Sequence, residues 1–474
     1  MGDLPDRSAA FFEWYLAAVD AAELTDKRYP VKGMNVWTPY GFLARRQMDR
    51  ILVEEIERSG ARPVEFPALI PQTEFQKEKE HIKGFDAQVY WVTRGGATEL
   101  DVPLVLRPTS ETAMYPMFAL WVRSHQDLPL TVYQIVNTFR YETKTTRPFL
   151  RVREIHFFEE HSCQTDAEAA SARVDANLAS FAAIARRLAL PYLALRRPEW
   201  DKFPGAFYSV ALDIPVGGAR TLQIGSVHHY RENFSGPYGI RYEAADGSSR
   251  LVHQTTFGLS ERLLGAVVAV HGDGRGVAFP SELAPYQVVI VPIPGRNGPD
   301  PVPWARTLAD RLRARGLRVH MDGREERPGA KYYHWEARGV PLRLEVGGRE
   351  ATQATATAVD RHGNRSVAGP EGLEASVEEA LRAFDRRLAE RAQTAFREAF
   401  APAASEADLV GSTRVRLFGW CGREACGHAV ETAIDGALLG TLVGPPPGEG
   451  PAPVACLVCG ATEEIRWAAA GRPL

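Results

Sequence analysis

Three short segments in the first 160 residues carry arginine and glutamate side chains that could serve phosphate chemistry. They are RPTSET at Arg107–Thr112, TFRYET at Thr138–Thr143 and RPFLRVRE at Arg147–Glu154. In the second segment Arg140 precedes Glu142 by two residues, so on a strand both side chains would point to one face. A guanidinium there can bind a phosphate, and a carboxylate can accept an adenine amino group. The segments predict a nucleotide site, although FRYE alone is a weak signal.

A fourth segment, HQTTFGLSERLLGAVVAVHGD, places a further cation where an anion is required. Gly258 and Arg262 lie at the opening of an apolar helix that we expect over Leu263–Val270. A cation on the first turn of a buried helix opposes the helix dipole, so Arg262 needs an anionic partner. A phosphate of ATP would serve.

Four of the five cysteines lie close together near the C-terminal end of the sequence. Cys421 and Cys426 are separated by four residues, and Cys456 and Cys459 by two, whereas Cys163 stands alone. In an intracellular chain, clustered pairs are more often a metal site than disulfides. The spacing predicts a structural zinc site with four thiolates and no open position, against the alternative of free structural thiols.

Length and composition bound the architecture that must position these residues. A chain of 474 residues suggests about three domains. The net charge of -3 shows no basic excess, so any RNA contact must come from local patches. The opening residues lack the features of a signal peptide, and no run of about 18 apolar residues is present, so we expect a cytoplasmic protein.

The sequence pattern predicts two domain boundaries in the chain. Residues 1–283 alternate amphipathic stretches with strand-like runs, which indicates a mixed, largely antiparallel sheet. Residues 284–400 alternate short strands and helices, which indicates a compact α/β domain with parallel pairing. They end in a long helix with an apolar stripe, and residues 401–474 hold the four clustered cysteines and the loop-like stretch GPPPGEGPAP.

The segments together resemble the class II aminoacyl-tRNA synthetases, and the whole chain is similar to the prolyl-tRNA synthetase family of the archaeal and eukaryotic type. EFPALIP at 65–71 resembles motif 1, FRYE within 138–154 motif 2, and GLSER within 258–270 motif 3. Four further segments occur along the chain in the same order as in the family: RYPVKG, EHIKGF, RPEWDKFPGA and RPGAKYYHWEARGVPLRLEVG. The resemblance implies an α+β catalytic domain with an antiparallel sheet, an α/β anticodon-binding domain, and a small zinc-binding α/β C-terminal domain.

The resemblance also implies roles in ATP chemistry. Arg140 would bridge the amino acid carboxylate and the α-phosphate, and Glu142 would accept the adenine amino group. Arg151 and Arg262 would neutralise the phosphate tail. Two further residues match positions that touch ATP or its ribose: Gln223 and Ser226. Such chemistry needs positioning and charge stabilisation with Mg²⁺ rather than a nucleophilic residue.

For the amino acid, the resemblance implies a pocket that fits L-proline. Thr109 and Glu111 match the acceptors of the two N–H donors of proline, and His228 matches a pocket residue. Three aromatic residues could wall the ring, with core packing as the alternative for the first two: Phe157, Phe158 and Phe203. Glu159 and His161 fall where the family has an acid and a histidine, but the surrounding FFEEHSCQ departs from the usual pattern.

The resemblance places tRNA(Pro) and a second copy of the chain among the partners. Glu336, Arg343 and Arg349 match residues that read the anticodon, with a surface ion pair between Glu336 and Arg343 as the alternative. The motif 1 region, with Pro67, would form a homodimer. Only about 120 residues separate Arg140 from Arg262, which leaves no room for a large editing insertion.

The expected activity is therefore proline--tRNA ligation through prolyl-adenylate. Two other functions are compatible with parts of the pattern: adenylation of proline or an analogue for a non-tRNA acceptor or a resistance role, and RNA binding without catalysis. The intact arginines and Glu142 argue against the last, and the two C-terminal modules argue against the first.

Overall fold

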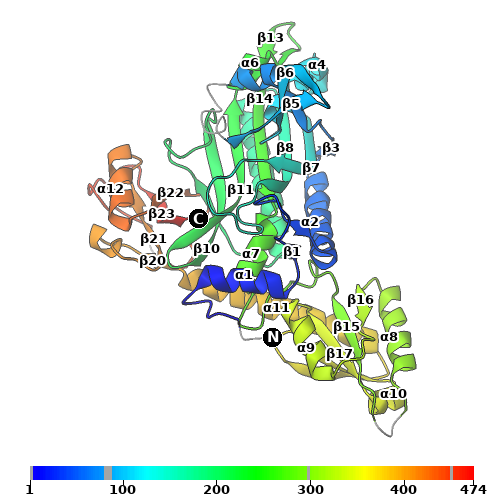
Figure 1. Ribbon diagram of the computed structural model, residues 1–474. Helices are drawn as coiled ribbons and strands as arrows, with labels where there is room; N and C mark the ends of the chain where they lie inside the picture. The colour runs from blue at the N-terminus through cyan, green and yellow to red at the C-terminus, as the bar shows by residue number, and fades with distance from the viewer. Residues whose placement is uncertain (1–3, 79–87, 296–298, 449–451) are drawn as a thin grey trace.

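The computed structural model describes residues 4–78, 88–295, 299–448 and 452–474, arranged around one long twisted sheet (Figure 1). The family segment EHIKGF and residues 449–451 of the proline-rich stretch lie outside the described residues. Among the residues described, eleven strands join this sheet. In spatial order they are β20 (Phe400–Pro402), β21 (Val415–Trp420), β23 (Arg466–Pro473), β22 (Ala437–Leu442), β9 (Leu193–Arg196), β10 (Tyr208–Gly217), β11 (Arg220–Arg231), β14 (His253–Ser260), β8 (Glu154–Gln164), β7 (Leu130–Phe139) and β3 (Arg62–Pro63).

Pairing within the central strands β9, β10, β11, β14, β8 and β7 is antiparallel throughout, as the sequence predicts. Alternation along β10 and β11 divides their side chains between two faces. Leu212 and Val227 are buried in the main hydrophobic core, whereas Ser209, Ser226 and His228 line a cavity on the other face. The sheet therefore separates a helix-covered core from the site.

Helices cover the core face of the sheet. They are α1 (Phe11–Ala21), α2 (Pro39–Arg58), α5 (Ala167–Arg187) and α7 (Arg262–His271). α5 packs on β8, β11 and β14, and α2 packs on α5. Both α2 and α5 begin at an N-cap side chain. The Thr38 side chain accepts from Gly41 N–H at 3.1 Å before α2, and the Asp166 side chain accepts from Ala169 N–H at 2.8 Å before α5. The predicted helix after Arg262 is confirmed.

Smaller elements complete this part of the chain. The strands are β1 (Thr25–Asp26), β2 (Val36–Trp37), β4 (Leu69–Pro71), β5 (Tyr90–Gly95), β6 (Thr98–Leu106), β12 (Arg241–Glu243) and β13 (Ser249–Leu251). The helices are α3 (Gln72–Phe75), α4 (Glu111–Trp121) and α6 (Ser235–Tyr238), with 3-10 turns at Gln76–Glu78 and His125–Asp127. β4, β6 and β5 form an antiparallel sheet of their own. β1 and β2 pair with each other beside α1 and α2, and β5, β6, β13, α4 and α6 lie together at one end of the central sheet (Figure 1).

A second sheet follows in chain order and carries its own core. Its strand order is β16 (Val319–Met321), β15 (Val288–Pro292), β17 (Leu342–Val346), β18 (Ala356–Asp360) and β19 (Arg365–Ala368). The helices around it are α8 (Val302–Ala314), α9 (Pro328–Ala337), α10 (Gly348–Gln353) and α11 (Leu373–Glu398). The first three strands pair in parallel, as predicted, but β17–β18 and β18–β19 are antiparallel.

The C-terminal strands continue the central sheet instead of forming an isolated unit. β22 pairs with β9 through Leu442 and Leu195, and β23 pairs in parallel with β11 through Arg472 and Arg220. α12 (Glu424–Ile434) packs on β22 and β23, with the 3-10 turn Glu406–Asp408 beside it. No helix in these described ranges has the length and apolar character needed to cross a membrane.

Candidate functional site

A cavity of about 520 Å³ lies on the face of the central sheet opposite α5. Strands β8, β10, β11 and β14 form its floor, and the segments around Thr109, Arg140 and Arg151 and the loop between β9 and β10 form its walls. Because the floor is antiparallel sheet, its side chains are held on rigid backbone, which suits a site that works by positioning.

Arg140 and Glu142 line this cavity, but the prediction that they lie on a strand is wrong. β7 ends at Phe139, and the N–H of Glu142 donates to the carbonyl oxygen of Arg140 at 2.7 Å, which closes a tight turn. The two side chains reach the same cavity because the chain bends, not because of strand alternation. Arg140 Nε is fixed by the Pro108 carbonyl oxygen at 3.1 Å.

Three guanidinium groups meet in the cavity, from Arg140, Arg151 and Arg262. Burial lowers the pKa of Arg262 to about 10, with a further lowering by Arg140 and Arg151, so all three act on one volume. Arg262 is held in place by the carbonyl oxygens of Leu150 at 2.9 Å and Gln223 at 3.2 Å. A concentration of fixed positive charge in a partly dry site stabilises anionic phosphates.

Glu142 approaches this group from the side of the loop. Its Oε2 lies 3.8 Å from Arg151 Nε, and its Oε1 accepts from the N–H of Lys144 at 3.0 Å. The Arg153 side chain donates to the Glu142 carbonyl oxygen at 3.0 Å and lies over the Tyr141 ring at 4.3 Å. The turn is therefore braced from both ends.

Thr109 and Glu111 form a pair of oxygen acceptors at the start of α4. The Thr109 hydroxyl donates to the Glu111 carboxylate, and Tyr230 OH donates to its other oxygen at 3.3 Å. Glu111 is buried, with 4% of its surface exposed. The Thr109 oxygen keeps its lone pairs for a further donor, as a ligand ammonium would provide.

Glu159 and His161 form a buried acid–base pair behind these acceptors. His161 Nε2 lies 3.2 Å from Glu159 Oε2, and His161 Nδ1 lies 3.2 Å from Tyr115 OH. Burial acts to raise the pKa of Glu159, but hydrogen bonds from His161, Ser110 and Gln134 outweigh it and lower that pKa. Burial likewise acts to lower the pKa of His161, yet Glu159 raises it. These opposite shifts favour the charged form of each partner, and both side chains line the cavity.

His228 is held as a neutral imidazole. Its Nδ1 lies 2.8 Å from Ser209 Oγ, which itself accepts the N–H of Phe203 at 3.0 Å. The Ser209 hydrogen can therefore point at Nδ1, an arrangement that would leave the imidazole proton on Nε2. Burial, together with His161, lowers the pKa of His228 to about 3. The Phe203 ring lies 4.8 Å from the imidazole ring, centroid to centroid.

The two phenylalanines left open by the sequence separate by strand alternation. Phe157 lines the cavity. Phe158 points into the core, where it is 1% exposed and stacks on Tyr133 at 5.9 Å. Core packing is therefore the role of Phe158 alone.

Gln223 and Ser226 also line the cavity, and Gln223 leads to residues that sequence reasoning missed. Its Oε1 accepts from Arg197 at 3.2 Å, and Arg197 forms an ion pair with the buried Asp213 at 3.0 Å. Glu261, beside Arg262, was missed as well; burial raises its pKa to about 7, and it accepts the N–H of His156 at 3.1 Å. The only signals were the place of Arg197 in RPEWDKFPGA and that of Glu261 in GLSER; Asp213 lies in neither segment.

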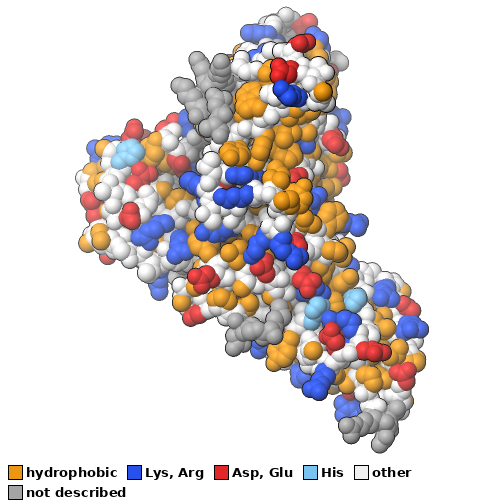
Figure 2. Space-filling model, in the orientation of Figure 1, with side chains coloured by type: hydrophobic (Ala, Val, Ile, Leu, Met, Phe, Trp, Pro, Cys, Tyr) orange, Lys and Arg blue, Asp and Glu red, His pale blue; other side chains and the backbone are white. Residues whose placement is uncertain are grey.

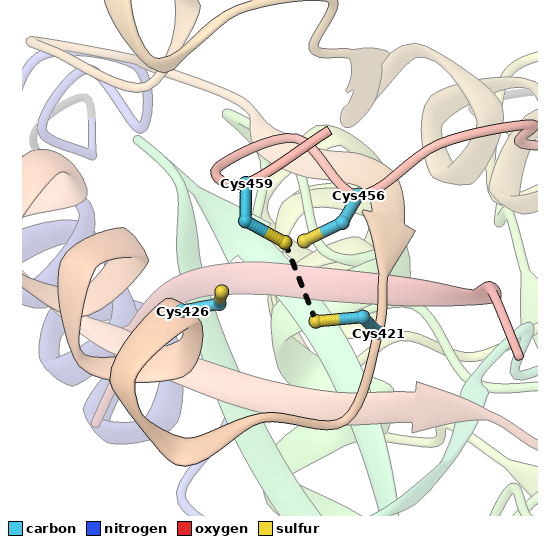
Figure 3. A group of neighbouring side chains, drawn as sticks. All are labelled: Cys421, Cys426, Cys456 and Cys459. Atoms are coloured by element: carbon cyan, nitrogen blue, oxygen red, sulfur yellow. Dashed lines mark hydrogen bonds between the residues drawn. The ribbon is translucent and has the colours of Figure 1, made fainter. Parts of the chain in front are cut away.

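The four clustered cysteines come together as a group (Figure 3). Their sulfur atoms lie within 4.8 Å of one another, and Cys421 Sγ is 3.8 Å from Cys459 Sγ. Tetrahedral Zn²⁺ with Zn–S bonds of about 2.3 Å places sulfur atoms about 3.8 Å apart, so the geometry fits that ion. Arg423 Nε lies 3.3 Å from Cys421 Sγ and also contacts Cys459. Despite burial, these hydrogen bonds lower the pKa of Cys421 to about 6.

In the second sheet, Glu336 and Arg343 form an ion pair, as the alternative had it, but the pair is largely buried and does not lie on the surface: 17% and 9% of the two side chains are exposed. Arg343 lies 3.0 Å from both Glu336 and Glu345, and its guanidinium lies over the Tyr332 ring at 3.9 Å. Arg349, in contrast, is exposed and pairs with its neighbour Glu350 at 2.8 Å.

Comparisons with known proteins agree with this geometry. Residues 90–271 match the tRNA synthetase class II core domain (G, H, P, S and T), and residues 287–386 match the anticodon binding domain. The chain is 49% identical to the proline--tRNA ligase of Thermococcus kodakarensis over 96% of each chain. It is 46% identical to that of Methanosarcina mazei, covering 98% of this chain and 97% of the other.

Solved structures show the same relationship. Prolyl-tRNA synthetase of Giardia lamblia in complex with prolyl-adenylate superposes with a TM-score of 0.93 and 32% identity over 100% of both chains. Prolyl-tRNA synthetase of Cryptosporidium parvum with L-proline and AMP gives a TM-score of 0.91 and 27% identity, covering 100% of this chain and 97% of the other. The predicted α+β fold class is confirmed.

Proposed function

The chain belongs to the proline--tRNA ligases among the class II aminoacyl-tRNA synthetases, and on this premise we propose how its residues carry out the reaction. ATP and L-proline react to prolyl-adenylate with release of pyrophosphate, and the prolyl group then passes to the 3′ end of tRNA(Pro). The observation that carries the assignment is the meeting of Arg140, Arg151 and Arg262 with Thr109, Glu111 and His228 in one cavity.

Arg140 is the proposed bridge between the two substrates. Burial lowers its pKa, and the carboxylates of Glu111, Glu159 and Glu142 partly oppose this effect by favouring the cation. Its planar fork can hold the carboxylate of proline and an α-phosphate oxygen together, which places the attacking oxygen in line with the departing pyrophosphate. Arg151 and Arg262 take the remaining phosphates, and ATP enters as its Mg²⁺ complex.

Glu142, Gln223 and Ser226 bind the rest of the nucleotide. Glu142 accepts the adenine amino group, while Gln223 and Ser226 contact the ATP ribose or phosphates. Gln223 is fixed for this task by Arg197, which is in turn fixed by the buried Asp213. Prebuilt polar contacts of this kind stabilise the transition state without reorganisation.

Proline is recognised through its secondary ammonium and its compact ring. Thr109 and Glu111 accept the two N–H donors, and the neutral His228 donates from Nε2. Phe157 and Phe203 wall the ring, because both line the cavity. The charged Glu159–His161 pair holds Ser110 and Tyr115 around the acceptors.

The C-terminal residues bind a structural Zn²⁺ through Cys421, Cys426, Cys456 and Cys459. These residues would hold the ion between α12 and the loop before β23, where it would supply a structural cross-link. Together with the unbroken chain between motifs 2 and 3, this site supports assignment to the archaeal and eukaryotic type. We accordingly divide the chain into a catalytic domain at 1–283, an anticodon-binding domain at 284–400 and a zinc-binding domain at 401–474.

The anticodon of tRNA(Pro) is read by Glu336, Arg343 and Arg349. The Glu336–Arg343 ion pair holds both side chains in one orientation, and Arg349, with 75% of its side chain exposed, can reach the RNA. Ordered polar side chains can read the edges of unstacked bases.

A second copy of the chain binds at the motif 1 region. Large apolar side chains there are exposed, among them Leu69 at 41%, Trp91 at 42% and Leu120 at 56%. Figure 2 shows hydrophobic side chains gathered over the upper part of the molecule, below the hairpin of β5 and β6 in Figure 1. Exposed apolar patches of this kind mark interfaces. The dimer is placed in the cytoplasm, where tRNA is charged.

The test is proline-dependent exchange of pyrophosphate into ATP, run beside aminoacylation of tRNA(Pro). Both activities are expected. Exchange without charging would point to a different acceptor for the prolyl group. Absence of exchange with proline would refute the assignment.

A further inference from the structure

The loop between β9 and β10, residues 197–207, connects the proposed proline pocket to the C-terminal residues. Trp200, Asp201, Lys202 and Phe203 line the cavity. At one end of the loop Arg197 donates to the Leu439 carbonyl oxygen in β22 at 2.7 Å. The wall of the pocket is therefore attached to an element some 240 residues later in the chain.

Trp200 is the main contact between this loop and α12. Its indole N–H donates to Glu431 at 3.1 Å, its ring lies 4.6 Å from that of His428, and it meets the edge of Trp420 at 6.1 Å. The ring also packs against Gly427 so closely that a Cβ at that position would lie 2.4 Å from its Cη2 and 2.7 Å from its Cζ2. Only glycine permits this contact.

Gly427 directly follows Cys426, one of the four clustered thiols. Cys426 is buried on the first turns of α12, and its sulfur faces the other three (Figure 3). When Cys426 is held in the cysteine group, the backbone of the next residue, Gly427, is held as well. The position of Gly427 in turn sets where the Trp200 ring can pack. A close-packed contact of this kind transmits small displacements instead of absorbing them.

On the other side, the same loop sets the geometry of His228. Phe203, three residues after Trp200, packs on the His228 ring at 4.8 Å, and its N–H donates to Ser209 Oγ, which is the hydrogen-bond partner of His228 Nδ1. The loop therefore controls both the wall and the N–H donor of the amino acid pocket. The ATP contacts of Arg140, Arg151 and Arg262 come from other segments. Arg197, which holds Gln223, stands at the first position of the loop and is anchored separately by Asp213 in β10 and by the Leu439 carbonyl oxygen.

We propose that Trp200 is a positioning residue that couples the cysteine group to the proline pocket, through Gly427 on one side and Phe203 and His228 on the other. The cysteine group thereby tunes proline affinity and leaves ATP affinity unaffected. This inference rests on the proposed assignment of His228 to the proline pocket.

The test uses the full-length enzyme and the substitution Gly427→Ala, which keeps all four cysteines. The added methyl group strikes the Trp200 ring and displaces the loop, and misplacements of about 1 Å are known to cost up to about 100-fold. We expect KM for proline in pyrophosphate exchange to rise about tenfold, with KM for ATP within about twofold of wild type. Bound zinc per chain stays unchanged. The matched control is Gly369→Ala, where no atom lies within 4 Å of the added Cβ, and neither KM changes.

A second substitution tests the coupling itself. Trp200→Phe removes the two ring atoms that the methyl group strikes, and the indole N–H as well. Alone it raises KM for proline about threefold, and in the G427A background it lowers that KM again, because space is restored. Calorimetric titration of proline without ATP gives the same order of affinities. Removal of zinc by chelation weakens proline binding to the wild type and adds little in G427A.

The outcomes distinguish a failure of the coupling from a failure of the proposed function. If the two KM values of zinc-loaded G427A rise together or stay unchanged, or if W200F gives no relief, the coupling is refuted while the proposed function stands. If the wild type shows no proline-dependent exchange, or if His228→Ala binds proline normally, the failure lies in the proposed function.

Discussion

Replacement of Arg140 by alanine tests the centre of the mechanism. In the proposed complex its guanidinium makes one charge-assisted contact to the proline carboxylate and one to the α-phosphate. Each is worth about 1.5 to 3 kcal/mol, so about 3 to 6 kcal/mol is lost together. At 1.4 kcal/mol per factor of ten, R140A should lower kcat/KM for exchange by about 10² to 10⁴. Arg151 and Arg262 do not compensate for the loss, because in the proposed complex they bind the remaining phosphates and neither bridges proline and ATP.

The assay is proline-dependent pyrophosphate exchange, with thermal unfolding as the check on folding. The side chain lines the cavity and donates to the Pro108 carbonyl oxygen, and its removal leaves the central sheet and the core helices in place, so the midpoint should fall by only a few degrees. Arg140→Lys keeps the charge but not the fork, and should retain part of the activity. The exposed Arg250, which pairs with Asp246 at 2.5 Å, provides the charge-matched control R250A with unchanged exchange. If R140A exchanges within tenfold of wild type while folded, the bridging role is refuted.

Three further results are expected. H228A should raise KM for proline about tenfold with little effect on KM for ATP. Because the pKa of His228 is lowered to about 3, any inflection of the proline KM near pH 6.5 should be the same in the wild type and in H228A, and an inflection that H228A abolishes would contradict a neutral donor. The pKa of Glu261 is raised from 4.5 to about 7. Between these values only the unfolded chain loses the proton, so the free energy of unfolding falls as pH rises. E261Q should remove this loss: measured by denaturant unfolding, the variant should be more stable than wild type by up to about 3 kcal/mol at pH 8 and equally stable below pH 4. An equal gain at both pH values would contradict that. Cys456→Ser should abolish stoichiometric zinc and lower the unfolding midpoint, whereas Cys163→Ala should keep the zinc; retained zinc in C456S would exclude it as a ligand.

The sequence could predict the parts of the site that depend on local pattern. Arg262 stands at the start of an apolar helix, and such a cation requires an anion wherever the helix lies. The two cysteine pairs carry their chemistry in their spacing. The order of the motifs identified the fold class, because relatives share that order as well as the residues.

Other features depend on contacts between segments far apart in the chain, and no local pattern encodes them. Strand alternation shows that Phe157 and Phe158 face opposite sides, but only packing against Tyr133 decides which one enters the core. The turn after Phe139 brings Arg140 and Glu142 into one cavity where a strand was expected.

The joining of the C-terminal strands to the central sheet is likewise a tertiary fact. Sequence composition separates residues 401–474 as a tail, yet β22 pairs with β9 and Trp200 rests on Gly427, more than 200 positions away. Hydrogen bonding between strand edges and close packing at a glycine depend on shape in three dimensions. The sequence by itself determined the chemistry available to this protein, and the tertiary structure decided which groups share one cavity and what holds them there.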